Sequence, residues 1–305
     1  MKSKSIILAA VFAAAGLLAA HATSQDYLRF GAEHIVGFYF HILTQVVDGT
    51  APYPYQARLL CPFTVTFLVK HLPLTTCHTL LFSRWFLDFA LLIMLAIMLR
   101  GYAIGPRDVF ISMAMCGWAL SYCDHGATLA HDNRVDVIAY ITAVVLLRRD
   151  KPLWIIPLTA VAATNRATSG LIPMLALVYG HRKTALAGWI TWAVVYGSIF
   201  WHYWPHPFVV QIEDKVTWGP FRFPDEPSDF MVMFAVLSLI PFIALARWRH
   251  WPRQLRLTFW CFLLPWLTIH SLIIAWGEPR LCMVPLAILF LPGVFAEEIR
   301  NDEHL

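Results

Sequence analysis

The sequence predicts an all-α, polytopic transmembrane helical bundle, and three observations support this fold class. Of the 305 residues, 59% are hydrophobic and only 14% are charged, whereas soluble domains carry about 25% charged residues. The apolar residues gather in long runs. These runs lack the two-residue alternation of membrane barrel strands. So few polar side chains cannot cover a soluble surface, which excludes a cytosolic enzyme, a disordered chain and a nucleic-acid-binding protein.

The first apolar run covers residues 5–20, behind Lys2 and Lys4. It ends at Ala20-His21-Ala22, which resembles a signal-peptidase site, so residues 1–22 are either a cleaved signal peptide or a first transmembrane helix. We favour a retained helix because the next apolar span needs a chain that already crosses the membrane. Residues 22–77 then form an extracytoplasmic segment with two amphipathic stretches, 34–47 and 61–72, suited to the membrane interface.

Residues 78–296 are expected to form the helical bundle, followed by a cytoplasmic tail at 297–305. The apolar runs of this bundle lie near 80–99, 108–123, 135–147, 153–164, 168–180, 185–203, 229–246, 257–276 and 281–296. The runs 153–164 and 168–180 each contain a proline and are too short to cross a bilayer core of about 30 Å. They predict a short broken hairpin, a feature tolerated at membrane depth where it lines a cavity. The whole chain is thus one integral membrane domain with about 9–11 membrane helices.

The Lys and Arg residues predict the orientation of the bundle, because cytoplasmic loops are enriched in them. With the N-terminus in the cytoplasm and the runs threaded alternately, every inner link between spans carries at least two basic residues. Both termini are then cytoplasmic. Residues 153–180 must go out and back as a hairpin, since Lys151 and Arg182-Lys183 flank them on the same side.

Most of the unusual polar residues fall on the outer face of this topology. They are Asp48, Arg58, Asp132, Arg134, Asp136, Asn165, Arg166, Glu278 and Arg280, with Asp124 beside them. For each residue taken alone, the alternative roles are to anchor the chain at the membrane interface, to cap a helix or to form a structural ion pair. Burying an Arg side chain at the tip of a half-length hairpin nevertheless costs free energy unless the side chain is paired with an acid or binds an anion. We therefore predict a cavity in which Arg58, Arg134, Arg166 and Arg280 bind phosphate, with Asp132, Asn165 and Glu278 as further binding residues.

Metal and cofactor chemistry is not predicted. The six cysteines, at 61, 77, 116, 123, 261 and 282, show no metal-ligand spacing. His125, His131 and Asp132 come from one short loop without helical register, which is weak evidence for a metal site.

Three short motifs resemble those of a group of poorly characterised bacterial polytopic membrane proteins. The block from Tyr53 to Pro62 resembles that group's Tyr-x-Tyr-Arg-x-Leu-x-Pro motif, and Asn165-Arg166-Ala167-Thr168 resembles its Asn-Arg-Glu-Thr turn. Gly277-Glu278-Pro279-Arg280, followed by Pro285-Leu286, resembles its Glu-x-Arg and Pro-Leu ending. The group is similar in layout to the GT-C superfamily of membrane glycosyltransferases.

The resemblance implies a GT-C-like bundle in a bacterial inner membrane, with membrane lipid and a polyprenyl-phosphate-linked sugar as partners. GT-C enzymes usually carry a catalytic acid in the first extracytoplasmic loop. Asp48 matches it best by position, with Glu33 and Asp26 behind it, so Asp48 is the expected base. The expected reaction moves the sugar to a cell-surface glycan or lipid. Two alternatives stay open: a transporter or flippase that binds an anionic solute or lipid, and a non-catalytic membrane subunit.

Overall fold

A computed structural model describes residues 2–51, 55–123, 130–203, 231, 234–273 and 279–296. Every element assigned in these ranges is helical, which confirms the all-α class. Three helical segments are long and apolar enough to cross a membrane, namely Ser5–Val47, Thr76–Gly101 and Arg182–Tyr203. The described residues therefore form a helical membrane bundle, while the total number of spans stays a prediction.

The N-terminal segment is one long helix rather than a short span followed by a loop. Helix α1 covers Lys2–His34 and is interrupted at Gly31, whose φ of 71° and ψ of 165° are non-helical. Ala15, Ala19 and Ala22 are completely buried, because small side chains let neighbouring helices approach closely. The helix also continues beyond residue 22, where we expected the extracytoplasmic segment to begin.

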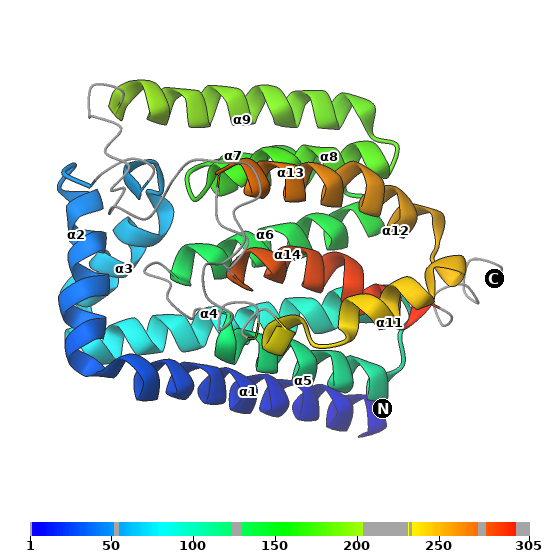
Figure 1. Ribbon diagram of the computed structural model, residues 1–305, viewed down its shortest axis with the longest axis horizontal. Coiled ribbons are helices and arrows are strands. Elements are labelled where there is room, and N and C mark those ends of the chain that lie inside the picture. The colour runs from blue at the N-terminus through cyan, green and yellow to red at the C-terminus, as the bar shows by residue number, and fades with distance from the viewer. Residues whose placement is uncertain are drawn as a thin grey trace.

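Two helical layers lie across one end of the bundle (Figure 1). The first is η1 (Ile35–Phe40), a π-helix that continues into α2 (His41–Val47), and the second is α3 (Leu60–His71), preceded by η2 (Tyr55–Ala57). They coincide with the amphipathic stretches predicted for the interface. We call this end of the bundle the capped end.

The central helices run between the capped end and the opposite end. They are α4 (Thr76–Gly101), α5 (Pro106–Tyr122) and α6 (Ala130–Arg148). The core is formed by these helices with α1 and continues into the hairpin and the C-terminal helices. Helix α6 begins earlier than the apolar run at 135–147 because acids at its start, such as Asp132, are favourable near a helix N-terminus.

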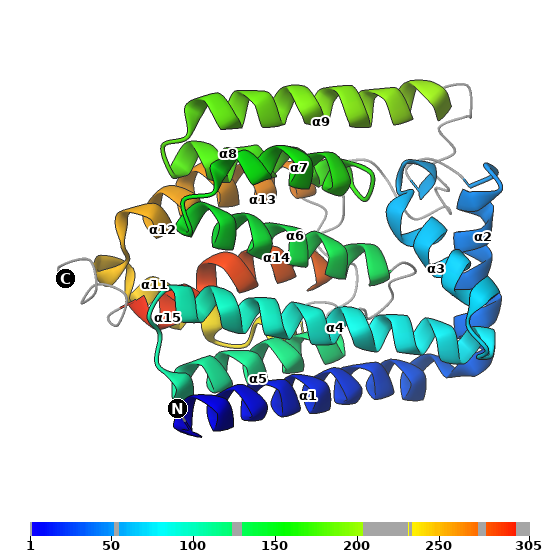
Figure 2. The same cartoon turned by 180° about the vertical axis from the view of Figure 1, so that it is seen from behind.

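The predicted broken hairpin is present (Figure 2). It consists of η3 (Pro152–Trp154), α7 (Ile155–Ala163), η4 (Ala167–Leu171) and α8 (Ile172–Val178). Pro173 lies at the start of α8, where proline costs no helical hydrogen bond. Helix α9 (Arg182–Tyr203) covers the hairpin and extends beyond its tip.

The C-terminal part of the bundle is made of short helical pieces. They are α11 (Ile240–Ala246), η5 (Trp248–His250), α12 (Arg253–Thr258), η6 (Phe259–Leu263), α13 (Leu264–Ile273), η7 (Pro279–Cys282), α14 (Met283–Pro285), η8 (Leu286–Phe290) and α15 (Leu291–Val294). The links α4–α5, α6–α7, α8–α9 and α11–α12 all lie at the end where α1 begins, opposite the capped end. We call this the basic end, because these links and their flanks carry Arg100, Arg107, Arg149, Lys151, Arg182 and Arg249.

Candidate functional site

The first turns of α6 provide the two carboxylates of the candidate site. Asp132 and Asp136 are four residues apart and therefore share one face of the helix. Their side chains are 3% and 0% exposed. Both face the tip of the α7–α8 hairpin, as their contacts show. Carboxylates buried this deeply are stable only when they are paired with cations or hydrogen-bonded.

The hairpin tip provides the first partner, Arg166. Its Nε lies 3.4 Å from Asp132 Oδ2, and its Nη1 lies 3.8 Å from Asp136 Oδ2. The same Nη1 donates a hydrogen bond of 3.4 Å to Asn133 Oδ1. The short tip is held against α6 because Asn165 Nδ2 donates to the backbone oxygen of Asp132 at 2.7 Å and Thr168 Oγ1 donates to Asp136 Oδ2 at 2.8 Å.

The segment before α3 provides the second partner, Arg58. Its Nη1 lies 2.9 Å from Asp132 Oδ2, the same oxygen that meets Arg166. The backbone N–H groups of Leu59 and Leu60 both donate to Thr164 O, at 2.8 and 3.0 Å. Cys61 Sγ donates to Asn165 Oδ1 at 3.3 Å. These contacts fasten the start of α3 to the hairpin tip and place Arg58 beside Arg166.

Arg280 is the third guanidinium of this region and is 8% exposed. Burial lowers the pKa of Arg58, the Asp132 carboxylate opposes this, and the positive charges of Arg166 and Arg280 lower the pKa further. Arg280 is therefore close enough to Arg58 for the two charges to interact. Three guanidiniums and two carboxylates of the described residues thus gather in this region. We call these five residues (Arg58, Asp132, Asp136, Arg166 and Arg280) the arginine cluster.

Two predicted site residues lie outside the arginine cluster. Arg134 Nε lies 2.9 Å from Asp88 Oδ1 of α4, and both side chains are completely buried. Because α6 is already helical at residue 130, Arg134 projects from a different side of the helix than Asp132. Asp48, the predicted base, is exposed at the end of α2, and among the described residues its side chain makes no ion pair with the cluster. Glu278, Asp124 and His125 lie outside the described residues.

Two residues of this region, Asp136 and Asn133, and two buried charged residues outside it, Asp88 and Arg84, were not predicted as site residues, and the sequence held signals for some of them. Asp136 follows Asp132 by one helical turn, the spacing of a shared face. Asp88 and Arg84 are charged residues inside the apolar run 80–99, where ionisable side chains are rare and paired. Asn133 carries no such signal. No three His, Cys, Asp or Glu side chains within the described ranges are placed to share a metal ion.

The arrangement defines an α-helical membrane protein with buried guanidiniums near one end of its bundle. Comparison with known proteins finds no matching family model, no similar curated protein and no similar solved structure. The function is therefore argued from the site alone.

Proposed function

We propose that this protein is a GT-C-like membrane glycosyltransferase of the bacterial inner membrane. It would move a sugar from a polyprenyl-phosphate donor to a cell-surface glycan or lipid on the extracytoplasmic face. The observation that supports the proposal is the arginine cluster, in which Arg58 and Arg166 meet at one oxygen of Asp132 and Arg280 lies close enough to act on the charge of Arg58. Guanidiniums gathered in this way from separate segments are suited to binding an anionic group such as phosphate.

A phosphate group fits the geometry of Arg58 and Arg166. The two guanidiniums come from separate segments, yet both reach one oxygen of Asp132. With Asp132 holding them side by side, the two guanidiniums would bind one phosphate group together, since guanidinium forks bind phosphate with two hydrogen bonds. The cluster lies near the capped end, where α2 and α3 would sit at the membrane interface (Figure 1). The hydrocarbon chain of a lipid-linked phosphate would hold the phosphate group at that depth in the membrane.

The proposed reaction forms one bond and breaks one. The oxygen of an acceptor hydroxyl attacks C1 of the sugar, and the bond from C1 to the phosphate oxygen breaks. Polyprenyl phosphate leaves with the electron pair, and the hydroxyl proton passes to a carboxylate acting as general base. Asp48 is the base implied by the resemblance, and its exposed position at the end of α2 requires an acceptor that arrives from the aqueous side. Asp132 would orient Arg58 and Arg166.

The proposal is tested in the native bacterium by replacing the chromosomal gene with variants and profiling surface glycans. Arg166→Met should abolish the product of the transfer and accumulate its lipid-linked donor, and Asp48→Asn should do the same if Asp48 is the base. Arg182→Met is the matched control, because Arg182 is exposed at the basic end. Unchanged glycans in Arg166→Met cells with normal protein levels would overturn the glycosyltransferase proposal.

A transporter or flippase is the second candidate, and the half-length helices α7 and α8 favour it, since broken helices line many transport sites. Alternating access would require a path to the basic end. There, Tyr102 and Tyr179 hydroxyls are 3.2 Å apart, and the Arg148 guanidinium lies 3.9 Å from the centre of the Tyr102 ring. These contacts join the ends of α4, α6 and α8 there. Movement of a fluorescent lipid between the leaflets of vesicles containing the purified protein would favour this candidate.

A further inference from the structure

The corner between α11 and α12, at the basic end, carries three arginines on its surface (Figure 1). Arg249, Arg253 and Arg256 are exposed, and within the described part of the chain none of them makes an ion pair. Arg148 at the same end, by contrast, donates from Nε and Nη2 to Gly101 O, at 3.2 and 2.9 Å. The three guanidiniums of the corner therefore present their charges to the surroundings of the protein.

One face of the helix that begins at Arg253 changes from charged to aromatic to aliphatic. Helix α12 continues through η6 into α13. Along it, Arg253, Arg256, Trp260 and Leu264 follow one another at spacings of three and four residues, which keep side chains on one face. Trp260 is 54% exposed and Leu264 is 44% exposed. The opposite face is buried, with Leu255, Thr258, Phe262 and Trp266. We call Arg253, Arg256, Trp260 and Leu264 the graded stripe.

The spacing along the graded stripe matches the depth profile of a bilayer leaflet. A helix rises 1.5 Å per residue, so Trp260 lies about 6 Å beyond Arg256 along the axis and Leu264 about 6 Å further. The polar headgroup region on each side of a bilayer is also roughly 6 Å deep. Arginines at the depth of the lipid phosphates thus place Trp260 at the boundary of the hydrocarbon core, where tryptophan is enriched. Leu264 then lies among the acyl chains.

Aromatic packing fixes the corner from which the graded stripe starts. Trp251 is 2% exposed, and its Nε1 donates to Ala244 O at 2.9 Å. The ring centroid of Trp248 lies 4.9 Å from that of Trp251 and 5.0 Å from that of Phe259, which in turn lies 5.1 Å from that of Trp260. Side chains that are already ordered lose less conformational entropy when a ligand binds.

We propose that the graded stripe binds an anionic phospholipid of the leaflet at the basic end. The lipid phosphate pairs with Arg253 and Arg256, and Arg249 adds positive charge beside them. One acyl chain runs along Trp260 and Leu264. The net negative charge of the lipid complements the three arginines, whereas the cationic group of a zwitterionic lipid is repelled by them. This site lies at the opposite end of the bundle from the arginine cluster, so the proposal is independent of the glycosyltransferase reaction.

Native mass spectrometry of the delipidated full-length protein in detergent measures the charge selectivity. The probes are phosphatidylglycerol and phosphatidylcholine with identical acyl chains. The Arg253→Gln, Arg256→Gln double variant should bind its first phosphatidylglycerol about thirtyfold more weakly than the unsubstituted protein, because each arginine near a lipid phosphate contributes about fivefold. Its affinity for phosphatidylcholine should stay within about twofold, since phosphatidylcholine carries no net charge.

The matched control is the Arg182→Gln, Lys183→Gln double variant, which removes two exposed charges at the same end but outside the graded stripe. It should keep the affinity for the first phosphatidylglycerol. Equal losses in the two double variants would show a general attraction of lipid to the basic end and would overturn the site. Equal affinities of the unsubstituted protein for the two lipids would overturn it as well, because arginines that only anchor the helix do not select a headgroup.

Photolabelling locates the acyl chain. A phosphatidylglycerol with a diazirine in one chain is added to the unsubstituted protein in phosphatidylcholine nanodiscs, and labelled peptides are identified by mass spectrometry. We expect labelling concentrated in residues 256–264, and suppressed by unlabelled phosphatidylglycerol. Trp260→Ala should reduce it, whereas Trp201→Ala, a tryptophan that is 79% exposed on α9, should not. Labelling spread evenly over the lipid-facing helices would contradict the proposal. Because the main measurement uses the unsubstituted chain, it decides the question even if a variant fails to fold.

Discussion

Arg134 and Asp88 are an ion pair with no exposure to solvent, between α6 and α4. Removing one partner leaves an uncompensated buried charge, whereas replacing both by apolar side chains of similar size removes that cost. We expect Arg134→Met to lower the free energy of unfolding by about 3–5 kcal/mol and the Arg134→Met, Asp88→Leu double variant to regain most of it. Thermal unfolding in detergent measures both. Full stability of the single variant would contradict a structural role, and so would failure of the double variant to recover.

At the same scale, the sequence predicted part of the membership of the arginine cluster. Arg58, Asp132, Asn165 and Arg166 were predicted as site residues and lie together. Arg134 was grouped with them because the residues before the apolar run at 135–147 were interpreted as a loop, in which neighbouring side chains can reach the same place. In a helix, positions two apart point to different sides, so a change of a few residues in the start of α6 moved Arg134 to another partner.

Gly188 of helix α9 lies at a point of close packing against the broken hairpin. A Cβ added at Gly188 would lie 2.8 Å from Pro173 Cγ of α8, while one added at Gly197 of the same helix meets nothing within 4 Å. Gly188→Ala should therefore destabilise the bundle by about 1–3 kcal/mol through overpacking. Gly197→Ala should leave stability unchanged or raise it by up to about 1 kcal/mol, because alanine is the better helix former. Equal melting temperatures of the two variants would show that α9 does not rest on the hairpin.

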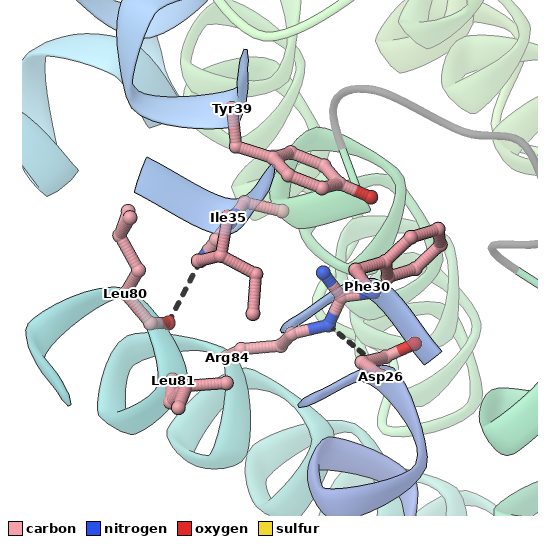
Figure 3. A pocket seen from close by; sticks show the side chains of 8 residues that line it. Asp26, Phe30, Ile35, Tyr39, Leu80, Leu81 and Arg84 are labelled. Atoms are coloured by element: carbon pink, nitrogen blue, oxygen red, sulfur yellow. Dashed lines mark hydrogen bonds and ion pairs between the residues drawn. The ribbon is translucent and has the colours of Figure 1, made fainter. Parts of the chain in front are cut away.

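At the scale of elements, the short hairpin was predicted from the length of two apolar runs and the proline in each of them. Both features can be read from the local sequence. The continuation of α1 to His34 was not predicted, because Asp26, Arg29 and Glu33 have the composition of an aqueous loop. The fold accommodates Asp26 by pairing it with Arg84 of α4 (Figure 3), which is 58 residues away in the sequence. A contact of this kind depends on how two helices meet and leaves no local pattern in either of them.

The two ends of the molecule differ, and this difference predicts the orientation of the protein in the membrane. The basic end gathers the links rich in Lys and Arg, whereas the capped end carries α2, α3 and the arginine cluster. Because basic links stay in the cytoplasm, the capped end should face outward. Single cysteines at exposed Thr50 and Lys151 report the two ends. In intact spheroplasts a membrane-impermeant maleimide should label Thr50→Cys, and Lys151→Cys should react only after permeabilisation. The unsubstituted chain measures the background of the native cysteines. The reverse pattern would place the arginine cluster in the cytoplasmic half and exclude a reaction on the extracytoplasmic face.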